Sequence, residues 1–165
     1  MSATIQIIKT YGAGPAGTEA NDTEFGLKAV DDHATAPADA PVVIPDITTV
    51  YSFESWMRFK CTVAPSNECT NFKIWGSGAA VGTGLVLTVN STAIDTYATP
   101  IDEVSAQGTR VNFASHGVGA KINVAGTLVD IDDETDFSVF QLEVGATAVP
   151  GDITPQDVNF SYDES

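Results

Sequence analysis

Basic residues are scarce in this sequence. Its 165 residues include 7 lysines and arginines against 22 aspartates and glutamates, for a formal net charge of -15. Proteins that bind nucleic acids neutralise phosphates with clusters of lysine and arginine. The charge balance therefore argues against DNA or RNA as a direct partner.

Long apolar runs are absent too. No stretch approaches the roughly 18 residues that a membrane-spanning helix requires. The first ten residues, MSATIQIIKT, lack the basic segment and the apolar segment of a secretion signal. We therefore expect no membrane partner, and we expect synthesis in a cytoplasm without export through a signal peptide.

Cysteine is nearly missing. Cys61 and Cys69 are the only two, and they flank the short segment TVAPSNE. If this segment is the turn of a hairpin, its two stems bring the thiols close enough for a disulfide. The expected cytoplasmic origin favours the alternative, which is two reduced and half-buried thiols. Zinc binding needs more ligands than these two, and no cysteine or histidine nearby supplies them.

The sequence also lacks the residue sets of nucleophilic catalysis. Its two histidines are His33 and His116, and Ser115 beside His116 makes no catalytic triad by adjacency alone. No G-x-S-x-G motif is present. We predict that the protein is not an enzyme and that it requires no cofactor.

Helical periodicity is the last absence. No segment repeats apolar residues at i, i+3, i+4 and i+7 over a dozen positions, and short alternating runs lie between glycine, proline, asparagine and aspartate. This pattern predicts an all-β protein, a two-sheet antiparallel β-sandwich of the jelly-roll type. The expected strands lie in 4–8, 41–45, 51–63, 70–75, 84–90, 109–115, 120–126, 127–131, 137–145 and 157–164. In 70–75 we expect Phe72 and Ile74 to face the core, and in 137–145 we expect Phe140, Leu142 and Val144 to share one face.

The segment 11–40 interrupts this series of strands. It is rich in glycine, alanine, aspartate and proline and has few large apolar side chains. Such a composition predicts an extended arm or a long surface loop, with at most one short strand in EFGLKAV, 24–30. We therefore divide the chain into 1–40, an N-terminal strand with its arm or loop, and 41–165, the β-sandwich domain.

The segment YSFESWMRFKCTV, 51–63, alternates between apolar odd positions and polar even positions, but Trp56 occupies an even position. A period of two predicts a strand with one buried face and one face toward water. On the next expected strand, Trp75 shares the polar face with Lys73. One hairpin would therefore direct two tryptophans and three cations outward.

Tryptophan and arginine are enriched in the hot spots of protein interfaces. The alternative is that a loop or the N-terminal arm covers the indole rings. We favour an interface for Trp56 and a covered ring for Trp75. The predicted partner-binding residues are Trp56, Arg58, Lys60, Lys73 and Trp75.

The segment DIDDETD, 130–136, contains five carboxylates in seven residues. Calcium takes six to eight oxygen ligands, but this spacing departs from the helix–loop–helix calcium site, which has a glycine at its sixth position. A solvated acidic turn is the favoured interpretation. The alternative is a Ca²⁺ site with ligands Asp130, Asp132, Asp133 and Asp136.

The two long strands carry a family resemblance. YSFESWMRFKCTV followed by NFKIWGSG resembles a pattern in virion structural proteins of tailed bacteriophages, in which a Y-S-x-E-x-W-x-R-x-K strand precedes an N-x-K-x-W strand. The ending FSYDES is similar to the YDE ending of such proteins, and the opening IQIIKTYGAGP is compatible with them. The resemblance covers both ends and the first two long strands, and the middle third carries no motif.

This resemblance implies a small β-rich head decoration (cement) protein. Such a protein would bind the outer surface of an assembled capsid, with the major capsid protein as its partner, and would stabilise contacts between capsid subunits. It would reside on the virion after synthesis in the host cytoplasm, and self-association, typically into trimers, is implied as well. Two alternatives stay open, a phage tail or fibre component and a carbohydrate-binding module that stacks Trp56 and Trp75 on sugar rings.

Overall fold

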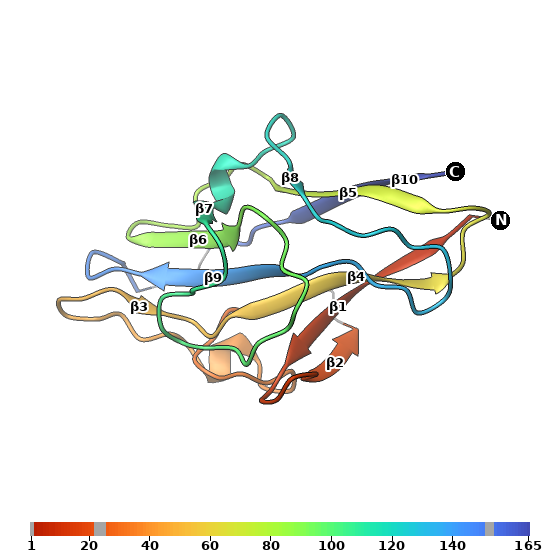
Figure 1. Ribbon diagram of the computed structural model, residues 1–165. Coiled ribbons are helices and arrows are strands. Elements are labelled where there is room, and N and C mark those ends of the chain that lie inside the picture. The colour runs from red at the N-terminus through yellow and green to blue at the C-terminus, as the bar shows by residue number, and fades with distance from the viewer. Residues whose placement is uncertain (1, 22–25, 151–153) are drawn as a thin grey trace.

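The computed structural model describes residues 2–21, 26–150 and 154–165, and these are almost entirely strand and loop. This confirms the predicted all-β class. The elements, labelled in Figure 1, are β1 (Thr4–Tyr11), β2 (Thr18–Asn21), the 3-10 helix η1 (Pro37–Asp39), β3 (Val50–Tyr51), β4 (Ser55–Val63), β5 (Cys69–Gly76), β6 (Leu85–Asn90), β7 (Arg110–Asn112), the 3-10 helix η2 (Phe113–Ser115), β8 (Ile122–Asn123), β9 (Ser138–Val144) and β10 (Val158–Glu164).

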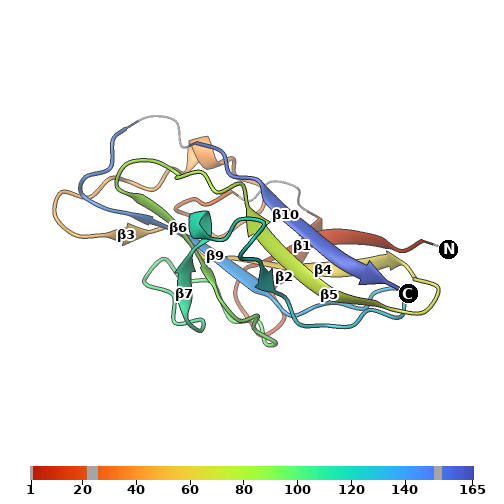
Figure 2. The ribbon, with the colours of Figure 1, turned by 90° about the horizontal axis from the view of Figure 1, so that it is seen from above.

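The strands form two antiparallel sheets, as predicted for a β-sandwich. The large sheet has the strand order β2-β1-β4-β9-β6-β7, and β3 also pairs with β9. The small sheet has the order β10-β5-β8. The small sheet lies above the large sheet in Figure 1, and Figure 2 looks down onto the small sheet. The jelly-roll subtype stays a prediction.

The main core lies between the two sheets. Phe59 of β4, Phe72 and Ile74 of β5 and Phe140 of β9 point into it and are at most 1% exposed. The rings of Phe59 and Phe72 stack across the sheets with their centroids 5.5 Å apart. Burying a side chain of this size stabilises the fold by roughly 1.5–3 kcal/mol. The predicted inward positions of β5 and β9 are thereby confirmed.

A second apolar cluster covers the other face of the large sheet. Trp56 of β4, Val139 of β9 and Phe137 pack there against Tyr97, which belongs to the loop 91–109 between β6 and β7. The side chain of Gln141 fixes this loop, because its Nε2 donates to the carbonyl of Glu103 at 2.7 Å. The large sheet is therefore covered on both faces, in contrast to the small sheet.

The predicted hairpin between 51–63 and 70–75 is wrong. β4 lies in the large sheet and β5 in the small sheet, so the turn 64–68 crosses from one sheet to the other. The alternation of β4 and β5 reports which face is buried, and both strands do bury one face in the common core. Alternation carries no information about the neighbouring strand, which is why the pairing could not be predicted.

Several expected strands are shorter or missing. The long strand 51–63 is divided into β3 and β4, the segment 41–45 contains no strand, and 127–131 contributes only an isolated bridge between Leu128 and Cys69. Of the expected strand 24–30, residues 24 and 25 lie outside the described residues, and 26–30 form none. Proline-bounded or loop-anchored segments can bury apolar side chains without ladder pairing, as Val42 and Ile44 do against the core.

In its described residues, the segment 11–40 contains the end of β1, the strand β2 and the 3-10 helix η1, with loops between them. It is attached to the sandwich in its described part. Lys28 is only 3% exposed, and its Nζ lies 2.7 Å from Asp32 Oδ1. The N–H of Phe53 donates to the carbonyl of Lys28 at 3.0 Å. Leu27 packs against the main core, so this loop belongs to the domain.

Both cysteines are free and buried in the main core. Burial raises the pKa of the Cys61 thiol and that of the Cys69 thiol. The structure therefore shows the favoured alternative, two reduced thiols, although they are fully buried where we expected half-buried ones. No helix in the described residues is long and apolar enough to cross a membrane.

Candidate functional site

The seven cations of the chain differ sharply in their surroundings, and this difference locates the site. Lys9 of β1 and Lys28 of the loop 26–40 are buried, at 4% and 3% exposure. Arg110 is partly buried at the start of β7, the edge strand of the large sheet, and its Nη1 donates to the carbonyl of Val139 at 2.6 Å. Burial lowers the pKa of Arg110 to about 10. These three cations are therefore engaged or buried within the fold.

Arg58 and Lys60 lie on the outer face of the large sheet, where carboxylates neutralise them. Arg58 forms ion pairs with Glu19 of β2 and, at 2.6 Å, with Glu134. Lys60 Nζ lies 3.0 Å from Glu134 Oε1 and 3.3 Å from Glu19 Oε2. Asp132 adds a further carboxylate 3.6 Å from Lys60. This cluster joins β2, β4 and the loop 124–137 and leaves no excess positive charge.

The cluster predicts a specific dependence of stability on pH. Partial burial raises the pKa of Glu19, but hydrogen bonds and charges from Arg58 and Lys60 outweigh it, so its pKa falls below the ordinary value of 4.5. A carboxylate with a lowered pKa stabilises the folded state above its unfolded pKa, and this stability is lost as the pH falls through the folded pKa.

We therefore expect Glu19→Gln to lower the free energy of unfolding at about pH 6, and we expect the difference from the wild type to shrink as the pH falls through the lowered pKa of Glu19 in the folded state. Denaturant titrations of both proteins over a series of decreasing pH values measure this difference. A difference that stayed the same throughout the acidic series would contradict the proposed ionic role of Glu19.

The two remaining cations, Lys73 and Lys121, lie on the outer face of the small sheet. Lys73 pairs in register with Asn123 of β8, and the same register continued by one residue places Lys121 beside Trp75. On the other side of β5, Trp75 pairs with Asn159 and Lys73 pairs with Ser161. We call this surface the Trp75 face, and it consists of Lys73, Trp75, Lys121, Asn123, Asn159 and Ser161.

The Trp75 face is partly exposed, since Lys73, Trp75 and Lys121 are half-buried and Asn123 is exposed. In Figure 2, β5 and β10 face the viewer, and the loop between η2 and β8 lies against the end of β5, where the N–H of Gly76 donates to the carbonyl of His116 at 2.8 Å. The ammonium group of Lys121 lies 3.9 Å from the centroid of the Trp75 ring, a cation–π contact. Within the described residues, neither Lys73 nor Lys121 forms an ion pair. Asp157 and Asp163 lie near the two ends of β10, and Asp163 accepts a hydrogen bond from Asn71 Nδ2 at 2.8 Å.

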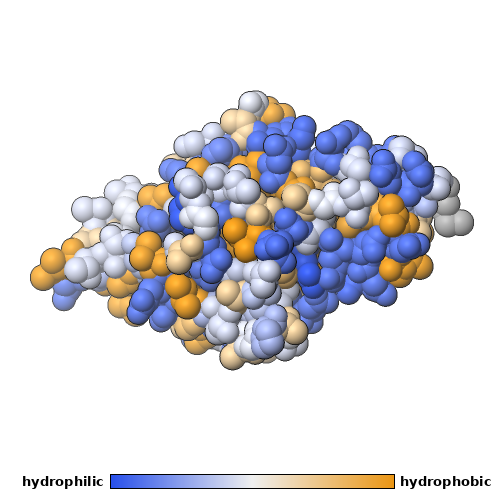
Figure 3. All heavy atoms as spheres, viewed as in Figure 1, coloured by the Kyte–Doolittle hydropathy of each residue, from blue (hydrophilic) through white to orange (hydrophobic). Residues whose placement is uncertain are grey.

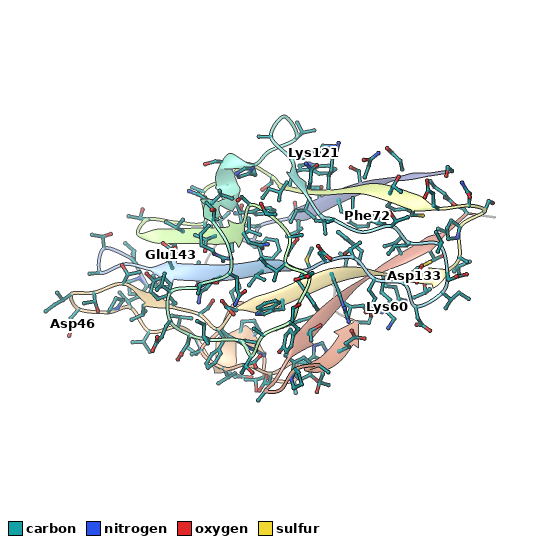
Figure 4. All side chains as sticks on the ribbon, in the orientation of Figure 1. Asp46, Lys60, Phe72, Lys121, Asp133 and Glu143 are labelled. Carbon is teal, nitrogen blue, oxygen red and sulfur yellow. The ribbon has the colours of Figure 1, made fainter. Side chains whose placement is uncertain are left out.

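Two of the five predicted partner-binding residues, Lys73 and Trp75, belong to this face. Arg58 and Lys60 lie on the opposite side of the sandwich, which Figure 4 shows by the positions of Lys60 and Lys121. The expectation that Trp56 points outward is wrong, because its side chain is 0% exposed. Its ring lies 5.1 Å from that of Tyr97, and its Nε1 donates to Glu54 Oε2 at 3.0 Å. The loop 91–109 covers this face, which is the alternative that we had favoured for Trp75.

Sequence reasoning missed Lys121 and Asn123. Both stand in the expected strand 120–126, but their place beside Lys73 and Trp75 depends on the pairing of β5 with β8. The alternation of Lys121, Asn123 and the buried Ile122 was the one local signal that these two residues share a polar face.

The acidic segment 130–136 forms a turn. Asp133 accepts hydrogen bonds from the backbone N–H groups of Val129 and Asp130 at 2.7 and 2.8 Å, and these bonds lower its pKa. Asp136 lies further along, and its pKa is raised by burial. Within the described residues, no group of three or more carboxylates, histidines or cysteines is arranged to hold a metal ion. The suggested ligands Asp130, Asp132, Asp133 and Asp136 are therefore not gathered around one point.

A second unusual surface lies at the end of the molecule near β3. Val43 and Ile47 are 76% and 87% exposed in the loop before β3, and Val149 is 67% exposed in the loop after β9. A cavity of about 290 Å³ separates these two loops and is lined by Val42, Val149 and other apolar side chains. In Figure 3, apolar atoms gather at the corresponding end of the visible face. Exposed apolar groups of this kind favour contact with another apolar surface.

Comparison with protein-family models, with curated protein sequences and with solved structures finds no match to this chain. The resemblance to phage virion proteins therefore rests on the motifs quoted above. The two tryptophans of those motifs lie in different surroundings, since Trp56 is in a core and Trp75 is half-buried on the outer face of the small sheet.

Proposed function

We propose that this chain is a non-enzymatic virion structural protein that binds the outer surface of an assembled phage capsid. Its Trp75 face would contact the major capsid protein and stabilise contacts between capsid subunits. The observation that carries the proposal is the distribution of the cations. Five of the seven are buried or engaged with carboxylates or backbone carbonyls, and the other two flank a half-buried tryptophan on the outer face of the small sheet. The motif resemblance gives this binding role its setting on a phage particle.

The geometry suits a docking surface. β5 is hydrogen-bonded on both sides, by β10 and by β8, so the side chains of the face project from a rigid platform. A rigid platform loses little conformational entropy when it binds. Trp75 supplies a large planar apolar group, and residues of this type carry much of the energy of protein interfaces.

The apolar end near Val43 and Ile47 is the second surface that could meet another protein. We assign the capsid contact to the Trp75 face because the register of β5 with β10 and β8 places six side chains on one face of a sheet, whereas the apolar end is built from two loops. Self-association, into trimers or another symmetric cluster, is part of the same proposal and would use a surface other than the Trp75 face.

Trp75 provides the test of this assignment. We expect Trp75→Ala to weaken binding to phage particles by on the order of 30-fold, as the loss of an interface hot spot does. Purified protein, mixed with particles from the producing culture that lack the chain, is sedimented over a range of concentrations to measure the apparent Kd. Val104→Ala serves as the control, because Val104 is 63% exposed in the loop that covers the opposite face.

Immunogold electron microscopy with an antibody against this chain, applied to these particles after they have bound the wild-type protein, tests the location. Gold over the heads supports decoration of the capsid. Gold confined to the tails would replace the capsid role by that of a tail component. Wild-type protein that bound no part of the particle would contradict the virion proposal itself.

The carbohydrate-binding alternative depended on two exposed tryptophans, and the structure does not provide them. Trp56 is buried, so it cannot stack on a sugar ring. The ammonium group of Lys121 already occupies one face of the Trp75 ring. The two tryptophans also lie in different sheets, so they do not form a common sugar platform.

A further inference from the structure

The Trp75 face carries an uncompensated positive charge on a strongly acidic protein. The chain has a formal net charge of -15 and 22 carboxylates, yet none of the described carboxylates is paired with Lys73 or Lys121. By contrast, Lys60 on the opposite side of the sandwich has three carboxylates within 3.6 Å. The two sides of the sandwich therefore differ in whether their lysines are satisfied within the chain.

The positions of these groups restrict what can bind. Lys73 lies on β5 and Lys121 directly precedes β8, so the two occupy diagonal positions of one face, with Asn123 directly across from Lys73. Diagonal neighbours on a sheet are separated by about 7–8 Å, which leaves room for an acceptor group between them. Figure 4 shows Lys121 directed outward from the small sheet. Ammonium and amide N–H groups around one gap form short, charge-assisted hydrogen bonds with carboxylates.

We infer that the surface that meets the Trp75 face is an acidic protein surface, with carboxylates seated between Lys73 and Lys121 and an apolar or planar group against Trp75. This inference rests on the proposed function and names the chemistry of the capsid partner. Charge complementarity supports a protein partner over a nucleic acid. Two lysines release too few counterions to hold a polyphosphate against the net charge of the chain.

The acidic rim of the face sets the extent of the contact. Asp157 and Asp163 lie toward opposite ends of β10, on either side of the two lysines. They would repel partner carboxylates placed beyond the lysines, because like charges across an interface are unfavourable. The partner is therefore acidic opposite β5 and β8 and lacks carboxylates opposite the ends of β10.

The test compares two variants of equal charge. Lys73→Gln with Lys121→Gln removes the two cations of the face, and Val104→Asp with Ala106→Asp adds two anions in an exposed loop on the opposite side. Each double variant therefore becomes more negative by the same two charges. Apparent Kd values for binding to particles that lack the chain are measured by sedimentation at about 50, 150 and 500 mM NaCl, because salt screens exposed charges over this range.

For the wild type we expect the affinity to fall on the order of tenfold between the lowest and highest salt concentration. The glutamine variant should bind on the order of tenfold more weakly at low salt, with little further effect of salt. The aspartate variant should behave like the wild type at 150 mM and above. Wild-type binding that does not respond to salt, or glutamine-variant binding equal to that of the wild type, would overturn the acidic partner and leave the proposed function intact.

A second measurement uses only the wild-type chain. The carboxylates of the particles are converted to neutral amides with a carbodiimide and glycinamide before the binding experiment. We expect this treatment to abolish the salt-sensitive part of the affinity. Unchanged binding to amidated particles would contradict the inference, whereas wild-type protein that binds neither treated nor untreated particles at any salt concentration would refute the proposed function together with it.

Discussion

Replacing Trp56 by alanine is expected to lower the free energy of unfolding by about 3–5 kcal/mol. The side chain is fully buried, and its ring meets those of Tyr97 and Phe137 edge-on at centroid distances of 5.1 and 5.4 Å. Alanine would leave a cavity beneath the loop 91–109. It would also remove the N–H group that donates to the buried carboxylate of Glu54, which is 2% exposed.

Denaturant unfolding followed by circular dichroism measures this loss. Trp56→Phe is the matched variant, because phenylalanine retains most of the apolar contact and removes only the hydrogen bond to Glu54. We expect it to cost about 1–3 kcal/mol, the usual penalty for an unsatisfied buried polar group. Val104→Ala, at an exposed position, should change the stability by no more than about 0.5 kcal/mol. If the free energy of unfolding of Trp56→Ala were within about 1 kcal/mol of the wild-type value, the packing of the second apolar cluster would be contradicted.

This expectation changes how a particle-binding experiment with Trp56→Ala is interpreted. If Trp56 were an exposed contact residue, its removal would release the protein from particles and leave it folded. Because Trp56 is in a core, a loss of binding would report unfolding. Trp75→Ala therefore tests the interface, and Trp56→Ala tests the fold.

Local periodicity predicted which side chains of a strand share a face, but it did not predict which other segments cover that face. Phe72 and Ile74 of β5, and Phe140, Leu142 and Val144 of β9, are buried as the alternation predicted. The same alternation placed Trp56 toward water, because an even position in β4 does face away from the main core. What covers that face is Tyr97 and its loop, about 40 residues further along the chain. A period of two cannot show that a distant loop packs on the polar side of a strand.

The candidate site shows the same division. Lys73 and Trp75 were predicted as contact residues from the pattern of one strand. Lys121 was missed, since its contact with the Trp75 ring depends on the pairing of β5 with β8. The carboxylates of Glu19 and Glu134, which neutralise Arg58, come from β2 and from the loop before β9. Charge partners distant in the sequence decide which cations are available, and a single sequence does not reveal them.

At Gly84, the addition of a single methyl group should destabilise the fold as much as Trp56→Ala does. Its φ of +71° lies in the left-handed region, and a Cβ atom there would lie 2.7 Å from both Ala148 Cα and the carbonyl carbon of Thr147. The strained backbone and the overlap with a neighbouring backbone each cost about 1–3 kcal/mol. We therefore expect Gly84→Ala to lower the free energy of unfolding by about 3–5 kcal/mol.

Gly78 provides the matched control, because it separates backbone conformation from steric overlap. Its φ of +80° is similar, but nothing lies within 4 Å of the position that a Cβ would occupy. Gly78→Ala should therefore cost only the conformational part, about 1–2 kcal/mol. Parallel denaturant titrations give both values. Equal losses would mean that the loop 145–150 moves aside at little cost, whereas a larger loss for Gly84→Ala shows that the N–H of Gly145, which donates to the Gly84 carbonyl at 2.9 Å, holds this loop firmly against the start of β6.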